Sequence, residues 1–321
     1  MSDDIGNNHL ESLSAGFFGK LPEFSDFIKY NASGKEILVL DNWIQEGLAL
    51  AKIKYKNEWK IYYNNCSKIY FIYPYSGTDK ITLGIIYPAN DKSGRSYPFI
   101  MFVNISKSII NGLQCYLIPS AFEQIYNSFD KILDSNNSIE DLTNLKALTT
   151  SVKIKSLNIS SLTDEYSRFT MEKYLGDIVD FKGESSVRLI DLFLDRINIL
   201  EHFCVINFMS NSNEQKDSQL IGFYIELMQR LFKETESISG IFWVHRNNQS
   251  GFLILSFTKP SPKDFIDLVF YDSVIDIEQK DRSYQITEPH KSLNSIFRNN
   301  AFVDNSISLN DFLNSIKNYI Y

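Results

Sequence analysis

Three closely spaced β-type runs in the first half of the chain constrain its fold more than any other feature. They cover residues 69–74, 81–88 and 98–105 and are dense in Ile, Tyr, Phe and Val, which fit a pleated and half-buried surface. The first link, residues 75–80, is short and contains Gly77, which is typical of a hairpin turn. Because parallel neighbours need a long crossover, links this short favour antiparallel pairing.

Helical periodicity surrounds these strands. Apolar residues recur at near-helical spacing over residues 41–59, with Asp41 able to cap the start. Ser120 and Glu123 form a capping-box pattern ahead of a second apolar run. A short helix is then expected from Ser138. The first half therefore reads as a sheet with helices packed against it.

The second half repeats this mixture of elements. We expect helices over residues 184–200 and 217–233, strands over 203–208, 240–244 and 252–257, a Ser-capped helix start at 261–264, and a last helix from Ser308. The sequence thus predicts an α/β protein, α+β-like in its connections. It would be a layered sandwich of mixed, largely antiparallel sheet with packed helices, in two halves of related size.

The length of 321 residues suggests two domains. Residues 1–13 are polar and are interpreted as a disordered tail. The polar segment that ends near Thr150 marks the predicted boundary. This gives an N-terminal α/β domain over residues 14–150 and a C-terminal α/β domain over residues 151–321.

The charge balance argues against nucleic acid as a partner. The formal net charge is −7, from 32 Lys and Arg against 39 Asp and Glu, and both halves are acidic. Binding to a phosphate backbone needs a basic excess, which neither half has. The longest apolar runs, such as residues 252–257, are far too short to span a membrane. The acidic first residues lack a secretory signal, so a cytosolic location without membrane insertion is expected.

The metal-binding residue types are few and scattered. The three cysteines, Cys66, Cys115 and Cys204, form no Cys-x-x-Cys pair, and no two of the four histidines are four residues apart. Zinc sites and disulfide frameworks both rely on such spacings. We therefore expect free thiols in a reducing compartment, no metal and no cofactor.

Two features invite a catalytic interpretation. Gly16 and Gly19 precede Lys20, but without the spacing of a phosphate-binding loop, so the segment is interpreted as a tight turn. Asp26 and Asp91 could act as an acid and a base. The sequence favours the alternative in which Asp26 caps a turn or helix and Asp91 holds its loop through Arg95.

The first of two informative motifs covers residues 16–28. It reads Gly-Phe-Phe-Gly-Lys-Leu-Pro over 16–22, followed by Asp-Phe-Ile over 26–28. This resembles the opening signature of the TagF family, also called ImpM, which comprises accessory proteins of bacterial type VI secretion systems. Ser25 stands where the family has a glycine. The residues that match the motif are Gly16, Phe17, Gly19, Lys20, Leu21, Pro22, Asp26 and Phe27.

The second motif covers residues 88–99. It reads Pro-Ala-Asn-Asp-Lys-Ser-Gly-Arg-Ser-Tyr-Pro-Phe and resembles a pattern that the same family carries after a core strand. Ala89 replaces a usual serine. The residues that match are Asp91, Gly94, Arg95 and Pro98.

The resemblance implies a cytosolic, post-translational regulator that restrains type VI secretion. Such a protein acts by binding components of the system, among them a forkhead-associated-domain scaffold protein, and is not an enzyme. Two other classes stay open. One is a small-ligand sensor whose loop 89–97 closes over an anion or nucleotide. The other is a hydrolase built around Asp26, Asp91 and Arg95.

The roles of some motif residues can be interpreted in two ways. Phe17 and Phe18 either pack in the core, which the sequence favours, or form an exposed anchor for a partner. Arg95 either fixes its loop through Asp91 or presents its guanidinium to a partner carboxylate or phosphate.

Overall fold

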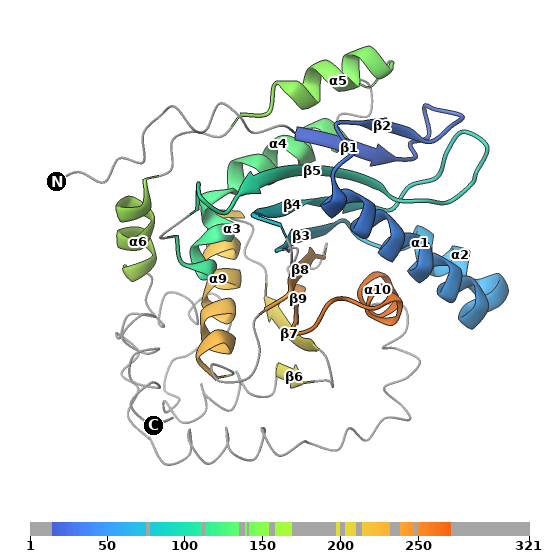
Figure 1. The fold of residues 1–321 in the computed structure, drawn as a ribbon. Helices are drawn as coiled ribbons and strands as arrows, with labels where there is room; N and C mark the ends of the chain where they lie inside the picture. The colour runs from blue at the N-terminus through green and yellow to red at the C-terminus, as the bar shows by residue number, and fades with distance from the viewer. Residues whose placement is uncertain are drawn as a thin grey trace.

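The computed structural model describes residues 15–74, 78–110, 113–134, 139, 141–153, 158–168, 197–199, 203–209, 214–231, 238–246 and 250–270. The strands of these residues form one continuous sheet of nine (Figure 1). The strands are β1 Ala15–Gly19, β2 Ile28–Tyr30, β3 Ile69–Tyr73, β4 Lys80–Tyr87, β5 Phe99–Ser106, β6 Ile197–Ile199, β7 Phe203–Met209, β8 Gly240–His245 and β9 Ser250–Ser256.

The order across the sheet is β2-β1-β5-β4-β3-β8-β9-β7-β6. Every neighbouring pair is antiparallel. The pairing of β3 with β8 joins the two halves of the chain, with Ile69 opposite Val244 and Ile72 opposite Ile241. The sheet therefore runs without interruption across the predicted domain boundary, and the division into 14–150 and 151–321 stays a prediction.

Helices cover both faces of the sheet (Figure 1). One face is covered by α1 Lys35–Tyr55, α2 Trp59–Asn64 and α10 Pro262–Val269. The other is covered by α3 Ile118–Ala121, α4 Glu123–Asp134, α5 Leu142–Thr150, α6 Ile159–Ser167 and α9 Glu214–Leu231. The result is a three-layer arrangement of helix, sheet and helix.

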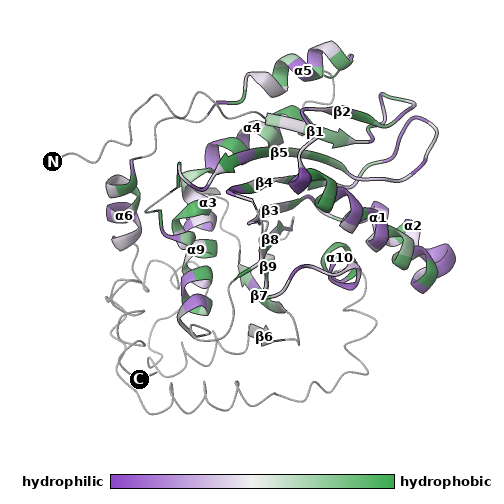
Figure 2. Cartoon of the chain, viewed as in Figure 1, coloured by the Kyte–Doolittle hydropathy of each residue, from purple (hydrophilic) through white to green (hydrophobic). Residues whose placement is uncertain are grey.

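The central strands are buried on both sides because helices cover both faces. On β5, Met101 and Val103 pack toward α4 and α9, while Ile100 and Phe102 pack toward α1 and α10. A strand covered on both faces reads as a near-continuous apolar run instead of an alternating one. In Figure 2 most of β5 is coloured green, toward the hydrophobic end of the scale.

Several predictions about the elements are confirmed. The layered, largely antiparallel fold is observed, as are the strands expected at 69–74, 81–88, 98–105, 203–208, 240–244 and 252–257 and the helix expected at 217–233. The helix start at 261–264 is a capping box. The Ser261 hydroxyl accepts the Asp264 N–H, and the Asp264 carboxylate accepts the Ser261 N–H.

Other predictions are wrong. The turn expected around Gly16 and Gly19 is strand β1. Asp41 does not cap a helix, because α1 begins at Lys35 and carries Asp41 inside it. Ser120 lies inside α3 and cannot cap α4, which begins at Glu123.

A few expectations fall partly or wholly outside the described residues. Of the helix expected over 184–200, residues 197–199 form β6. The rest of that segment is not described, nor are residues 1–13, the turn residues 75–77 and the helix expected from Ser308. The helix expected from Ser138 corresponds to α5, which begins at Leu142 and is capped by the Asp141 carboxylate.

Candidate functional site

The connection between β4 and β5, residues 88–98, forms a shaped loop at the end of the sheet. The Tyr97 N–H donates to the Ala89 carbonyl at 3.2 Å, and the Asp91 N–H donates to the Arg95 carbonyl at 3.1 Å. Gly94 turns the chain with a φ of 76°, in the left-handed region that favours glycine. The loop thus continues the hairpin beyond the last paired residues of the sheet.

The Asp91 carboxylate is the centre of this loop. Its Oδ1 accepts the backbone N–H groups of Ser93 and Arg95, both at 2.9 Å. Its Oδ2 accepts Lys20 Nζ at 2.9 Å and Arg95 Nε at 2.7 Å. The Asp91 side chain has no solvent exposure. Four donors therefore surround one buried carboxylate, two of them charged, which makes these bonds stronger than neutral ones.

This surrounding changes the pKa of Asp91. Burial alone would raise the pKa, because it disfavours the charged form. The hydrogen bonds from the Arg95 N–H and from the Lys20 and Arg95 side chains outweigh burial and hold the pKa of Asp91 well below its usual range. The carboxylate is therefore ionised and already fully occupied by internal donors. It is badly placed to take a proton from a substrate.

Arg95 joins this loop to the loop that follows β1. Its Nη2 donates to the carbonyl of Ser25 and lies 3.7 Å from the exposed carboxylate of Asp26. The Lys92 N–H also donates to the Phe24 carbonyl, at 2.9 Å. The Arg95 side chain is nevertheless 57% exposed. It can therefore fix the two loops and still offer part of its guanidinium to a partner.

Sequence reasoning missed three contacts that support the loop. The Tyr63 hydroxyl, on α2, donates to the Ala89 carbonyl and accepts the Ala89 N–H, both at 3.1 Å. Lys60 Nζ donates to the Gly94 carbonyl at 3.0 Å. The Tyr97 hydroxyl donates to the Asp41 carboxylate on α1. None has a local sequence signal, because the partners are 26 to 56 residues apart.

The motif residues divide into a loop group and a core group. Lys20, Asp26, Phe27, Asp91, Gly94 and Arg95 gather around the two loops. Phe27 is partly exposed, with its ring 5.3 Å from that of Tyr97. The core group supports them from within the sheet and comprises Gly16, Phe17, Gly19, Leu21 and Pro98; Pro22 is exposed beside them.

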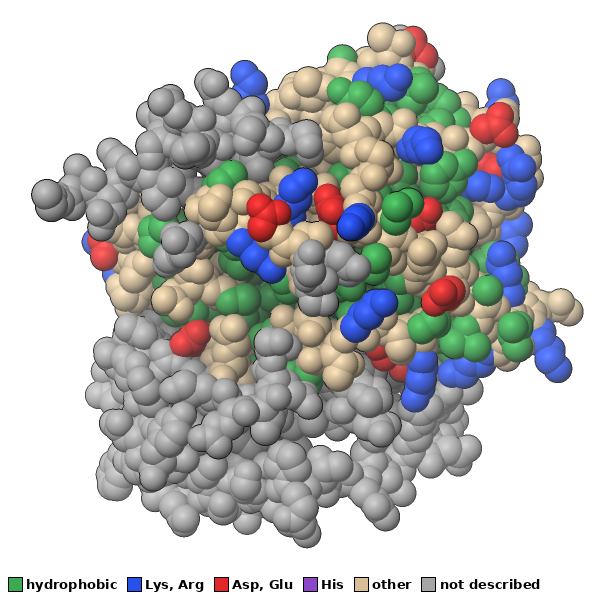
Figure 3. All heavy atoms as spheres, viewed as in Figure 1, with side chains coloured by type: hydrophobic (Ala, Val, Ile, Leu, Met, Phe, Trp, Pro, Cys, Tyr) green, Lys and Arg blue, Asp and Glu red, His purple; other side chains and the backbone are tan. Residues whose placement is uncertain are grey.

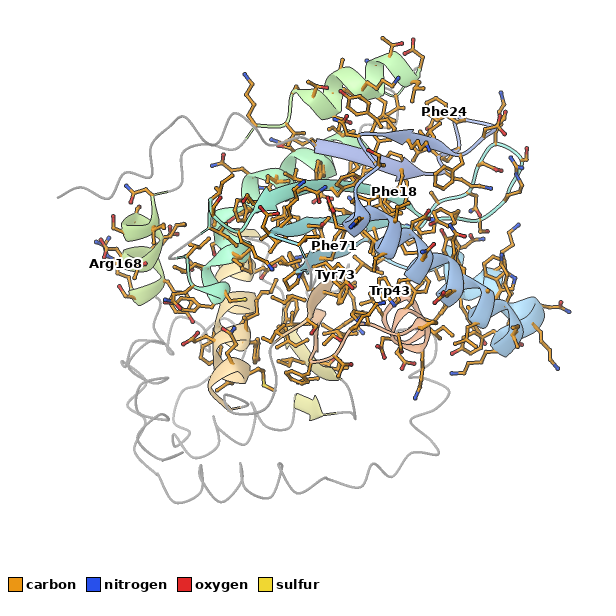
Figure 4. The ribbon with its side chains drawn as sticks, viewed as in Figure 1. Phe18, Phe24, Trp43, Phe71, Tyr73 and Arg168 are labelled. Atoms are coloured by element: carbon orange, nitrogen blue, oxygen red, sulfur yellow. The ribbon has the colours of Figure 1, made fainter. Side chains whose placement is uncertain are left out.

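Phe17 and Phe18 are both buried, on opposite faces of the sheet. Figure 4 shows Phe18 lying beside α1. They pack in the core and are not an exposed anchor. Gly19 has a φ of 128°, and a Cβ there would lie 2.1 Å from the Pro98 carbonyl oxygen. The glycine thus lets β1 pass close to the start of β5.

Residues 16–152, which include both motifs, match the family model of the TagF N-terminal domain, described as type VI secretion system-associated. This stretch is a TagF N-terminal domain. In the described structure, that TagF domain supplies β1 to β5 and α1 to α5.

The fold was also compared with solved structures. The crystal structure of PA0076 from Pseudomonas aeruginosa PAO1, at 2.05 Å resolution, shares 13% sequence identity with the chain. The alignment covers 80% of this chain and 94% of PA0076, with a TM-score of 0.44. No curated protein shows significant sequence similarity to the chain.

The described residues were also searched for metal-binding groups and for membrane-spanning helices. Among the described residues, no three His, Cys, Asp or Glu side chains gather into a group that could hold a metal ion. No helix in the described ranges is both long enough and apolar enough to cross a bilayer.

Proposed function

We propose that the chain is a cytosolic, post-translational regulator of a type VI secretion system, and that it restrains the system by binding other proteins. Its partners would be components of that system, with a forkhead-associated-domain scaffold protein as the first candidate. The TagF domain supports the association with type VI secretion. The proposal that it acts by binding, and not by catalysis, rests on the geometry around Asp91.

The observation that carries this proposal is the fully bonded, buried Asp91 carboxylate. Four donors fix the loop 88–98 from within, two of them from Lys20 and Arg95 side chains. A preformed loop loses little conformational freedom when a partner binds, which favours affinity. Arg95 and Phe27 are partly exposed on this rigid support, and arginine and aromatic side chains are enriched among residues that dominate protein interfaces.

The two other classes find less support in the same geometry. A hydrolase would need Asp91 or Asp26 as a base. Asp91 is a weak base, because its pKa is held low and both of its oxygens already accept hydrogen bonds from internal donors. Asp26 is solvent-exposed, and its carboxylate lies 3.7 Å from Arg95. A sensor that closes loop 89–97 over an anion would need that loop to move, whereas its bonds to Lys20, Tyr63 and Phe24 hold it in place.

The test is a gene deletion followed by complementation. We expect the deletion to raise effector secretion while the amounts of the structural components stay the same, because the regulator acts after translation. The wild-type gene should restore restraint. The Arg95→Ala variant should restore it poorly, while Lys131→Ala, which changes an exposed lysine on α4, should restore it fully. Unchanged secretion in the deletion strain, under conditions where the system fires, would contradict the proposal.

A further inference from the structure

The end of α1, the 3₁₀ turn at Lys56–Glu58 and α2 together form a basic surface on an acidic protein. Residues 50–64 contain four lysines and a single acidic residue, Glu58, whereas the chain as a whole has a net charge of −7. Figure 3 shows lysine and hydrophobic side chains intermixed over the lower right of the molecule, where α1 and α2 lie.

Large apolar side chains are exposed within this basic segment. Ile53 is 74% exposed and Ile61 is 61% exposed, and Leu50 is exposed one turn before Ile53. Ile44, which is fully buried against the sheet, lies nine residues before Ile53. Nine residues are about two and a half helical turns, so Ile53 points away from the core. The packing of α1 against the sheet therefore does not explain why an isoleucine stands at position 53.

Three of the four lysines in this segment have no described carboxylate that neutralises them. Among the described residues, no carboxylate lies within ion-pair distance of Lys52, Lys56 or Lys60. The Glu58 carboxylate instead accepts the Tyr62 hydroxyl at 3.0 Å. Lys52 Nζ lies 4.8 Å from the centre of the Trp59 ring. Lys52, Lys56 and Lys60 therefore bring positive charge, without a described ion-pair partner, to the segment that carries the exposed isoleucines.

The surface is also continuous with the motif loop. Lys60 Nζ donates to the Gly94 carbonyl at 3.0 Å, and Gly94 is followed by the partly exposed Arg95. A partner that contacts Arg95 would thus lie next to α2. We call Leu50, Lys52, Ile53, Lys54, Lys56, Lys60 and Ile61 the basic–apolar surface.

We propose that the basic–apolar surface is a docking site for an acidic segment of a partner protein, whose Asp and Glu side chains surround an apolar centre. This inference rests on the proposed function and assigns the chemistry of its partner. Charge complementarity supports it, because opposite fields steer association and reject partners of like charge. The exposed isoleucines supply apolar area that a purely electrostatic contact would not use.

Three other occupants fit the surface less well. Single-stranded nucleic acid would be expected to stack its bases on exposed aromatic rings, whereas the most exposed large side chains here are aliphatic. A lipid surface would take up a whole apolar helix face, but the broad apolar face of α1 is already buried against the sheet. In a two-fold symmetric dimer, a second copy of this chain would place the same lysines against this surface, and like charges disfavour that contact.

The experiment measures binding of the purified full chain to each purified cytosolic type VI component of the same strain, including the forkhead-associated-domain protein. The two test variants are Lys56→Glu and Ile53→Ser. The matched controls are Lys131→Glu, on the opposite face of the sheet, and Leu38→Ser, at the other end of α1, where Leu38 is also exposed. Melting curves establish that all four variants are folded, as expected for exposed positions.

We expect one component to bind the wild-type chain and each test variant to weaken that binding about tenfold, the effect of losing a central interface contact. Added salt should weaken the wild-type complex more than the Lys56→Glu complex. Salt screens the attraction between Lys56 and the acidic partner, which the variant has already lost. Reversing an acidic residue in the component to lysine should partly restore binding to Lys56→Glu. Both controls should bind like the wild type.

Several outcomes would overturn the inference. If a component binds both test variants as tightly as the wild type, this surface is not the docking site, although the proposed function stands. If no component binds the wild-type chain, the proposed function fails together with the inference. If the test variants lose only binding to phosphatidylglycerol vesicles, or only self-association in sedimentation velocity, then the occupant is a lipid surface or a second copy.

Discussion

The indole N–H of Trp43, on α1, donates a 2.6 Å hydrogen bond to the backbone carbonyl of Ser261, the residue that caps α10. The Trp43 ring also meets the Phe265 ring edge-on, with 5.2 Å between centroids, and lies 5.5 Å from the Phe242 ring. Figure 4 shows Trp43 between the two helices. A side chain of the TagF domain thus fixes a helix that begins more than a hundred residues after that domain ends.

Replacing Trp43 should reveal how strongly the two halves depend on each other. Trp43→Phe keeps a ring but removes the hydrogen bond and some volume, so we expect a loss of about 1–2 kcal/mol in the free energy of unfolding. Trp43→Ala leaves a larger cavity and should lower it by about 3–5 kcal/mol. Urea denaturation measures both. Trp59→Phe, at a half-exposed ring away from α10, serves as the control and should change stability less.

Asp91 and Arg95 should behave as a coupled pair. Asp91→Ala leaves Lys20 and Arg95 without their buried acceptor, and Arg95→Ala removes a donor and the link to Ser25. Each should lower the melting temperature, Asp91→Ala by more. The effects of substitutions within one hydrogen-bond network are not additive. The double variant should therefore lose less stability than the sum of the two single variants. If the decrease in melting temperature of the double variant equals the sum of the two single decreases, the two side chains act independently.

The low pKa of Asp91 predicts how this contribution varies with pH. An unfolded aspartate titrates near pH 4, whereas the folded carboxylate keeps its charge to lower pH. The unfolded state therefore takes up the proton first, and the stabilisation is complete above about pH 4 and is lost as the pH falls below it. The stability difference between wild type and Asp91→Asn should be constant from pH 5 to 7 and shrink in more acidic buffer. A difference that stays constant at low pH would count against the buried ion cluster.

Two glycines of the motifs should tolerate substitution differently. Gly94 has a positive φ, but open space surrounds the position of a Cβ. Gly94→Ala should therefore lower the free energy of unfolding by only about 1–2 kcal/mol, the backbone penalty, and Gly94→Asn by less. At Gly19 a Cβ would also collide with the Pro98 carbonyl. Gly19→Ala should be much more destabilising, and equal losses for the two alanine variants in urea denaturation would contradict this reading.

The elements that could be predicted from sequence are those with a local cause. The apolar runs of β3, β4 and β5 follow directly from burial on both faces, and the Ser261 capping box satisfies helix N–H groups within four residues. The prediction of a turn at β1 was wrong because Gly19 allows the strand to pass close to Pro98 and does not form a turn. The local pattern around residue 16 contains nothing that distinguishes these two uses.

The elements that could not be predicted depend on partners far along the chain. Glu36, in the first turn of α1, is buried and accepts a hydrogen bond at 2.9 Å from Asn104, which is 68 residues away. Asp41 looked like a cap because its partner, Tyr97, is 56 residues away. In the site, the Asp91–Arg95 pair has a local spacing and was predicted. The bond from Lys20 crosses 71 residues and was not.

The antiparallel pairing of β3 with β8 also has a consequence for the order of synthesis. About 170 residues separate the two strands, so at roughly 5–20 residues per second a ribosome needs on the order of 10–30 s to reach β8 after completing β3. Throughout that interval the growing chain has no partner for one side of β3, a strand of five mostly buried residues. An unpaired apolar strand edge invites pairing with other chains. The nascent TagF domain is therefore open to pairing with other chains along that edge until the second half of its own sheet has been translated.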